Sequence, residues 1–228
     1  MNQSNFESSN YSSSTALQGF MQRVYQWMAA GLAVTGLVAM WTAGNPDLMR
    51  ALAGGGFLVL MLAELGLVFW LSASITKISP QAAIAGFLIY SALNGLTLSF
   101  IFLAYTGASI ATTFFITAGT FAGVSLFGWV TKSDLSSMRG ILMMGLIGVL
   151  LASLVNLFWQ APALYWIISY AGLAVFIGLT AYDTQMLKQW HQSGVVAGDQ
   201  MAVMGALKLY LDFINMFLFL LRLFGRRK

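Results

Sequence analysis

Three acidic residues lie inside stretches of this sequence that are otherwise apolar enough for the interior of a membrane. Asp183 ends one such stretch, in the run G-L-T-A-Y-D-T-Q, and Asp212 lies in the middle of the last one, residues 201–224. Glu64 lies midway along an earlier stretch, residues 48–71. An ionisable side chain near a bilayer centre costs at least about 2.5–3.5 kcal/mol, so each should face protein or water. Residues in such positions are candidates for ion paths, proton switches and carboxylate chemistry.

The last apolar stretch carries a polar stripe. Lys208, Asp212 and Asn215 follow one another at spacings of four and three, which places them on one face of a helix. This stripe predicts a helix surrounded by the others. The alternative for each acid is a purely structural one, in which a hydroxyl, an amide or Lys208 satisfies a buried carboxylate.

Composition restricts the fold class. The chain has 228 residues, of which 59% are hydrophobic and 8% are charged, against about 25% charged in soluble domains. No charged residue occurs in 78–131 or in 140–182. These features predict a polytopic helical membrane protein, and the lack of strand-like alternation argues against a barrel.

Seven apolar stretches are long enough to cross a bilayer, which takes about 20 residues each. They are residues 20–43, 48–71, 80–105, 108–130, 141–159, 164–183 and 201–224. We therefore predict an all-α polytopic membrane protein with seven transmembrane helices, one membrane domain at 17–228 and a disordered polar tail at 1–16. The longest polar connection is expected at 184–200.

Small residues predict where helices approach closely. Gly119 and Gly123 form one small-xxx-small pair, and Ala174 and Gly178 form another. The run Gly54–Gly56 either weakens the second helix or permits very close packing.

Other residue counts exclude several functions. The net charge of +4 is concentrated in a basic tail, which indicates a membrane surface rather than a nucleic-acid partner. The absence of cysteine excludes disulfide and thiolate chemistry, and a single histidine, His191, argues against a histidine-based metal site or triad. No cleavable signal is visible, so the first helix should act as its own signal.

Lysine and arginine counts predict a cytoplasmic N-terminus, with five on that side against one on the other when the C-terminal tail is left out. Four basic residues in the tail bring the second side to five as well. Either the tail is translocated or the last segment re-enters and returns, and charge does not choose between them.

Three other functions have specific weaknesses. An intramembrane aspartyl protease would share a proton between two acids, but the run Leu209–Asp212 lacks the Gly-x-Gly-Asp pattern of presenilin-type proteases. A retinal protein would have its aspartate four residues before the lysine, whereas Lys208 precedes Asp212. A secondary transporter would show an internal repeat, which is absent.

Several motifs resemble those of the Bax inhibitor-1 family, in particular its bacterial inner-membrane branch. The run Gly178–Gln185 and the run Leu209–Asn215, followed by L-L-R, resemble its two signature stretches. The runs Tyr25–Met28, Ser91–Thr97 and Thr131–Ser136 also fit, and the resemblance covers nearly everything after Leu17.

This resemblance implies six helices around a central seventh. It also implies that Asp183 and Asp212 form a hydrogen-bonded pair that senses pH and gates a calcium leak. Two such carboxylates cannot both ionise cheaply, and the fully ionised pair would offer oxygen ligands to Ca²⁺. Glu64, Lys208 and Asn215 are candidates for the ion path or latch. The family's arginine on the second helix is missing here, and Lys208 is a candidate substitute.

We therefore expect a non-catalytic, pH-sensitive cation leak protein, without cofactor, in the bacterial inner membrane. Its expected partners are the lipid bilayer and Ca²⁺. The family also offers another function, regulation of a membrane-anchored ATP-dependent quality-control protease. In that case residues 1–15 would engage the protease and neither acid would be needed.

Overall fold

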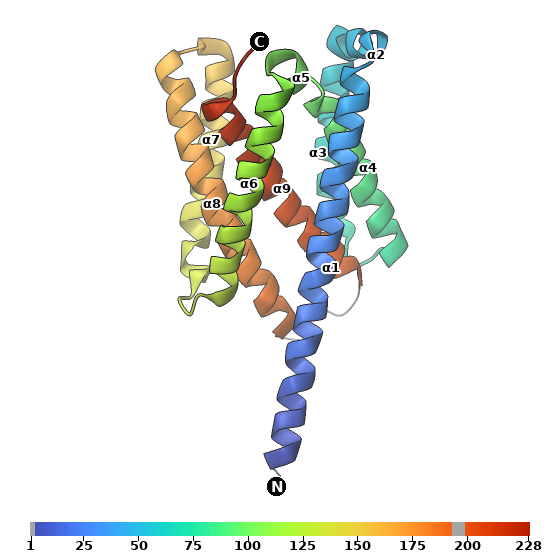
Figure 1. The fold of residues 1–228 in the computed structure, drawn as a ribbon, viewed down its shortest axis with the longest axis vertical. Coiled ribbons are helices and arrows are strands. Elements are labelled where there is room, and N and C mark those ends of the chain that lie inside the picture. The colour runs from blue at the N-terminus through green and yellow to red at the C-terminus, as the bar shows by residue number, and fades with distance from the viewer. Residues whose placement is uncertain (1–2, 193–198) are drawn as a thin grey trace. The chain divides into compact units, whose positions relative to one another are not determined.

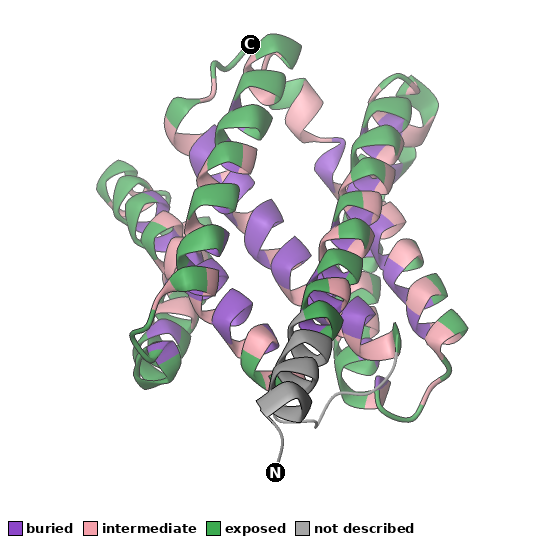
Figure 2. Ribbon diagram, turned by 60° about the horizontal axis from the view of Figure 1, so that its bottom comes forward, coloured by how far each residue is buried: buried purple, intermediate pink, exposed green. Residues whose placement is uncertain are grey.

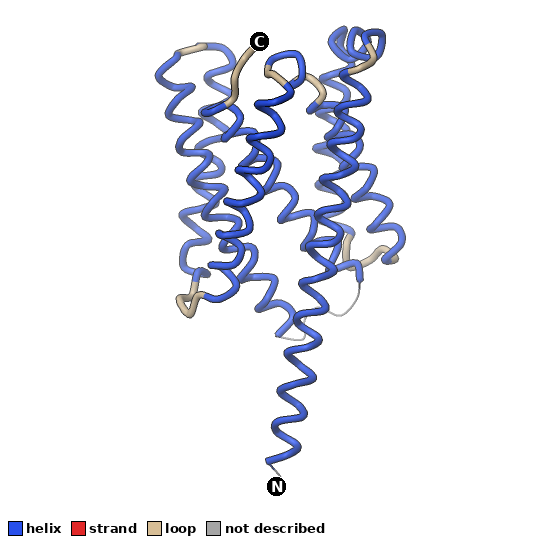
Figure 3. Tube along the Cα trace, in the orientation of Figure 1, coloured by secondary structure: helices blue, strands red, loops and turns tan. Residues whose placement is uncertain are grey.

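A computed structural model describes the backbone of residues 3–192 and 199–228, and the side chains from residue 15 onward within these ranges. All the named elements in this part of the chain are helices (Figures 1 and 3). They are α1 (Gln3–Ala43), α2 (Pro46–Ala51), the π-helical turn η1 (Leu52–Gly56), α3 (Phe57–Ser74), α4 (Pro80–Leu98), α5 (Ile101–Ala104), α6 (Gly107–Val130), the 3-10 turn η2 (Leu135–Met138), α7 (Arg139–Trp159), α8 (Pro162–Gln192) and α9 (Asp199–Phe224).

Within the described ranges, seven helical segments are long and apolar enough to cross a membrane. The second combines α2, η1 and α3, the third combines α4 and α5, and the fifth combines η2 and α7. The predicted all-α polytopic membrane fold is therefore confirmed.

One predicted boundary is wrong. Residues 184–200 were expected to form a polar connection, but α8 continues to Gln192 and α9 begins at Asp199. Gln185 is buried and Leu187 is fully buried, so the extension of α8 is amphipathic and packs on one side. The remainder of that connection, residues 193–198, lies outside the described residues.

The chain divides into two compact units. The first contains residues 1–101 and 187–210, and the second contains residues 102–186 and 211–228. Helices α8 and α9 each contribute to both units. The predicted division into a disordered tail at 1–16 and one domain at 17–228 stays a prediction, although the backbone of α1 is helical from Gln3.

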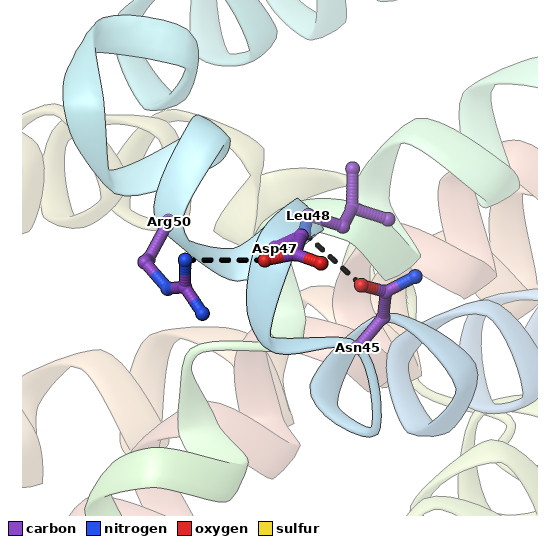
Figure 4. Close-up of polar contacts among 4 residues, drawn as sticks. All are labelled: Asn45, Asp47, Leu48 and Arg50. Atoms are coloured by element: carbon purple, nitrogen blue, oxygen red, sulfur yellow. Dashed lines mark hydrogen bonds and ion pairs between the residues drawn. The ribbon is translucent and has the colours of Figure 1, made fainter.

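In the first unit, α4 packs against both α1 and α3. A Cβ at Gly95 of α4 would lie 2.7 Å from the carbonyl oxygen of Thr35 in α1, which shows how closely these two backbones approach. The entry to the second span is fixed by Asn45, whose side chain accepts a 3.2 Å hydrogen bond from the Leu48 N–H, and by a 3.1 Å ion pair between Arg50 and Asp47 (Figure 4).

The glycine run of the second span breaks its helix. Gly55 has φ +112°, a left-handed conformation that residues with a Cβ rarely adopt, and Gly54 is also non-helical. Nothing in the described structure lies within 4 Å of a Cβ built at either position. Of the two predicted roles of Gly54–Gly56, the weakened helix is therefore observed at these two glycines and close packing is not.

The predicted close contact at Gly119 and Gly123 is wrong, because no described atom of another helix lies within 4 Å of a Cβ built at either residue. In the second unit, the close approach on α6 is at Gly128, whose Cβ would lie 2.4 Å from the Ala181 carbonyl oxygen on α8. At Gly178 the prediction agrees, since a Cβ there would lie 2.5 Å from a methyl group of Leu142 on α7.

The last helix, α9, is continuous from Asp199 to Phe224. In the first unit its start lies beside the start of the first span, where Arg23 and Asp199 are 3.4 Å apart. In the second unit its end lies beside the turn between α5 and α6, where the Thr106 N–H donates to the Arg226 carbonyl at 3.1 Å. An unbroken α9 of this length is long enough for a full crossing, and the choice between a full crossing and a re-entrant last segment stays a prediction.

Helix α9 is by far the most buried of the seven spans. In its most apolar stretch 72% of the residues are buried, compared with 11–39% in the other six (Figure 2). This burial shows that most of α9 faces protein. The arrangement of six helices around it stays a prediction.

Candidate functional site

Asp183 lies on a segment of α8 that is tightly fixed within the second unit. Its side chain is buried, with 7% exposed. The following residue, Thr184, makes a 2.9 Å hydrogen bond between its hydroxyl and that of Ser125 on α6. Together with the close contact between Gly128 and Ala181, this bond holds α8 against α6 on both sides of the carboxylate. A carboxylate held by such rigid neighbours has a defined position.

Two residues after the acid, Gln185 connects α8 to the loop between α6 and α7. Its amide oxygen accepts a 2.8 Å hydrogen bond from the Leu135 N–H, and its amide nitrogen donates a 2.9 Å bond to the Ser133 carbonyl. These two bonds attach the loop to α8 at a position two residues after Asp183. Sequence reasoning quoted Gln185 within the signature run but assigned it no role, and its position two residues after the acid was the available signal.

Asp212 lies on α9 in the same unit and is also buried, with 4% exposed. Its neighbour Phe213 packs edge-on against two phenylalanines of α6, Phe114 at 5.4 Å and Phe121 at 5.6 Å between ring centroids. The acid thus lies on a strongly apolar helix beside an aromatic cluster. Both Asp183 and Asp212 take part in polar or electrostatic interactions. Their pairing with one another stays a prediction.

Of the other two polar residues predicted on α9, neither is fully buried. Asn215 is half-buried and donates a 2.8 Å hydrogen bond to the carbonyl of Leu211 in its own helix. Lys208 is half-buried, belongs to the first unit and also has an interaction partner. Of the three residues of the stripe, Asp212 is therefore buried, whereas Lys208 and Asn215 are half-buried.

Glu64 has partners on α4, in the first unit. Its carboxylate accepts hydrogen bonds from the Asn94 side-chain amide at 3.3 Å and from the Thr97 hydroxyl. An asparagine partner is what the structural alternative for Glu64 predicted. A role on the ion path stays a prediction.

The bonds to Glu64 belong to a longer hydrogen-bonded chain. The Tyr210 hydroxyl donates to the Asn94 side-chain oxygen at 3.2 Å and lies 2.6 Å from the Thr35 hydroxyl. Thr35 in turn donates to the Ser91 carbonyl at 2.8 Å. This network, Glu64, Asn94, Thr97, Tyr210, Thr35 and Ser91, connects residues of α1, α3, α4 and α9. Sequence reasoning missed Tyr210, although it lies two residues before Asp212.

The sites therefore fall into two groups. The second unit holds two buried acids on α8 and α9, and the first unit holds an acid within a polar network. In the described part of the chain, no group of three or more His, Cys, Asp or Glu residues is placed to hold a metal ion. Any cation at Asp183 or Asp212 would therefore be completed by carbonyl, hydroxyl or water oxygens.

Comparison with known proteins agrees with this architecture. The family model described as inhibitor of apoptosis-promoting Bax1 matches residues 17–228. The inner membrane protein YbhL of Escherichia coli is 49% identical over 219 residues, covering 93% of both chains. Relatives of unassigned function from Deinococcus radiodurans and Borreliella burgdorferi are 48% and 44% identical over at least 90% of each chain.

The chain has seven helices that are long and apolar enough to cross a membrane, among the described residues. One family model matches it from residue 17 to residue 228. The predicted location as a multi-pass protein of the bacterial inner membrane agrees with these helices and with the inner-membrane relative. This protein belongs to the Bax inhibitor-1 family.

Proposed function

We propose that this protein is a pH-sensitive cation leak channel of the bacterial inner membrane, with Ca²⁺ as its permeant ion. It would be non-catalytic and would need no cofactor. The observation that carries the proposal is the burial of two carboxylates, Asp183 and Asp212, in membrane helices of the same unit. Buried intramembrane acids are costly, and they usually serve ion or proton movement.

The chemistry of pH sensing follows from like charges. Two carboxylates within hydrogen-bonding reach share a proton and titrate as a coupled pair, since ionising both at close range is costly. Loss of the last proton would change the charge of the site by one unit. That change can bias a gate between two states. The family resemblance supports the pairing.

The number of acids favours passage over tight binding. Ca²⁺ takes six to eight oxygen ligands in proteins, whereas two carboxylates offer four oxygens at most. Conduction requires binding that is favourable enough for entry and weak enough for release. A two-carboxylate site completed by weaker oxygens meets both conditions.

Orientation completes the proposal. We propose that α9, which is continuous and long enough to cross a membrane, places the basic tail on the side opposite the N-terminus. The other basic residues favour the N-terminal side, so we place the N-terminus in the cytoplasm.

The test is calcium flux into liposomes that contain the reconstituted protein and a trapped dye, recorded from pH 5 to 8. We expect a pH-dependent leak in the wild type. Asp183→Asn and Asp212→Asn should each abolish it or make it independent of pH. Absence of flux from correctly folded protein at every pH would contradict the channel.

Three control variants separate the acid pair from other titrating groups. His191→Gln removes the one histidine, the residue type whose charge ordinarily changes between pH 5 and 8. Asp47→Asn makes the same chemical change at an exposed position.

The Ser136 N–H holds the pKa of Asp134 below its ordinary value, so this acid stays ionised above pH 5 and loses its hydrogen bond only at lower pH. Asp134→Asn should therefore preserve the pH profile.

The alternative function, regulation of a membrane-anchored ATP-dependent protease, needs the tail at residues 1–15 rather than the two acids. This tail lies largely outside the described side chains. Deleting it should leave calcium flux unchanged if the channel proposal holds. If this deletion, which keeps both acids, abolishes an effect of the protein on proteolysis in cells, the regulator function is favoured.

A further inference from the structure

A polar cavity lies in the second unit, next to the C-terminal tail. Neither Asp183 nor Asp212 is among its lining residues. It has a volume of about 560 Å³, within the range of about 300–1,000 Å³ that is typical of ligand pockets. Its walls come from the end of α7, the start of α8, the end of α9 and the C-terminal tail. The polar lining residues are Asn156, Gln160, Tyr165, Arg222 and Arg227.

Two guanidinium groups converge on one ring in this cavity. Arg222 lies 5.1 Å and Arg227 lies 5.7 Å from the centroid of Tyr165, and Arg227 donates a 2.9 Å hydrogen bond to its hydroxyl. No Asp or Glu lines the cavity. The ion pairs found among the described residues involve neither arginine. The cavity therefore carries two positive charges without a neutralising carboxylate.

The tail is held in place, so the position of Arg227 is defined. The Arg226 N–H donates to the Ser109 hydroxyl at 2.8 Å, and the Lys228 N–H donates to the Ala104 carbonyl at 3.1 Å. A Cβ at Gly225 would lie 2.1 Å from the Leu221 carbonyl oxygen, so the turn into the tail requires glycine. A hydrogen bond to Tyr105 raises the pKa of Arg227, which keeps the group charged.

The surroundings of the cavity indicate where its ligand comes from. Trp159, next to the lining residue Gln160 in the chain, is 77% exposed, and the lining residue Trp166 is 47% exposed. Exposed tryptophans at the ends of membrane helices lie at the level of lipid headgroups. A ligand here would therefore meet positive charge inside the cavity and an aromatic rim at the membrane interface.

We infer that this cavity binds the phosphate of an anionic phospholipid headgroup through Arg222 and Arg227. Guanidinium groups match phosphate oxygens with paired, charge-assisted hydrogen bonds. Asn156 uses its side-chain oxygen to accept from the Ala161 N–H at 3.1 Å, so its amide hydrogens are left as donors for a neutral part of the headgroup.

The test uses full-length protein in a neutral detergent. Phosphatidylglycerol, phosphatidylcholine and inorganic phosphate are titrated separately, and binding is followed by the thermal midpoint and by native mass spectrometry. We expect phosphatidylglycerol to bind and to raise the midpoint, and the other two to have little effect. The double variant Arg222→Gln/Arg227→Gln should weaken phosphatidylglycerol binding about tenfold or more.

A matched control lies between the two arginines in the tail. Arg226 is exposed and uses only its backbone in the bonds described, so Arg226→Gln removes the same charge without touching the cavity. It should keep binding within about twofold of the wild type. If Arg226→Gln weakens binding as much as the double variant, binding is a general surface-charge effect and the inference is overturned.

Two further results would also overturn it. Equal stabilisation by inorganic phosphate would show an anion site that does not select lipid, and unchanged lipid binding in the double variant would show that the arginines are not used. If the double variant misfolds, the single variant Arg227→Gln is compared with Arg226→Gln instead. Arg227 is exposed and lies next to the chain end, so this change should not disturb folding.

Discussion

Tyr210 shows how one hydroxyl organises polar groups from several membrane helices. It is fully buried, and its ring meets Phe87 edge-on at 5.6 Å and Tyr90 at 6.0 Å. Its hydroxyl bonds with Asn94 and Thr35, so the ring fixes the position from which the hydroxyl acts. Because Asn94 also donates to Glu64, the tyrosine indirectly positions that carboxylate.

We predict that Tyr210→Phe destabilises the protein by roughly 0.6–1.7 kcal/mol, from the average to the largest value measured for hydrogen bonds between membrane helices. The change leaves the ring packing intact and removes only the bonds to Asn94 and Thr35. Unfolding in mixed micelles by denaturant measures the difference. Tyr170→Phe removes the same hydroxyl from a side chain that is 61% exposed, and it should have no comparable effect.

At the scale of elements, α6 and α8 approach most closely where a glycine allows backbone contact. Spacing in the sequence indicated Gly119 and Gly123, but the close contact is at Gly128. A small-xxx-small pair indicates that a helix can be approached closely. Which of its faces meets another helix depends on rotation about the helix axis, which spacing does not determine.

We predict that Gly128→Ala destabilises the second unit, because its methyl group would lie 2.4 Å from the Ala181 carbonyl and force α6 away from α8. The thermal midpoint in detergent should fall clearly. Gly119→Ala is the matched control in the same helix. It meets nothing within 4 Å among the described atoms and gains helix propensity, so its midpoint should be unchanged or slightly higher. A larger loss at Gly119 would show that the packing of α6 has been misassigned.

The same displacement should affect function, since Ala181 lies two residues before Asp183. If the buried acids gate the leak, Gly128→Ala should also change the pH profile of calcium flux. Gly119→Ala should leave it unchanged.

At the scale of the whole molecule, the path of the last helix determines where the chain ends. The tail bonds to the turn between α5 and α6, so both should lie on the same side of the membrane. The loop at residues 131–134, between α6 and α7, lies at the other end of α6 and should be on the opposite side.

We predict that single cysteines confirm this topology, since the chain has no cysteine of its own. Lys228→Cys and Gly107→Cys should react with a membrane-impermeant maleimide from one side, and Ser133→Cys should react from the other. Intact and inverted vesicles give the two sides. Labelling of Lys228→Cys together with Ser133→Cys would mean that α9 does not cross. With a cytoplasmic N-terminus, Ser133→Cys reacts in inverted vesicles.

The sequence by itself determined the fold class, the family and the identity of the two buried acids. The fold class and the two acids follow from apolar length, from the absence of charge over long stretches and from the cost of placing a carboxylate in lipid, whereas the family follows from the resemblance of the signature runs; none of these depends on how helices meet. It also indicated that α9 is buried, because its polar residues recur at helical spacing.

Only the tertiary structure decided which residues meet. It gave Glu64 its partners on α4, moved the close contact on α6 from Gly119 and Gly123 to Gly128, and extended α8 to Gln192. Each outcome depends on the rotation and neighbours of a helix. Residues far apart in the chain, such as Tyr165 and Arg227, come together only through packing, and periodicity along one helix carries no information about that.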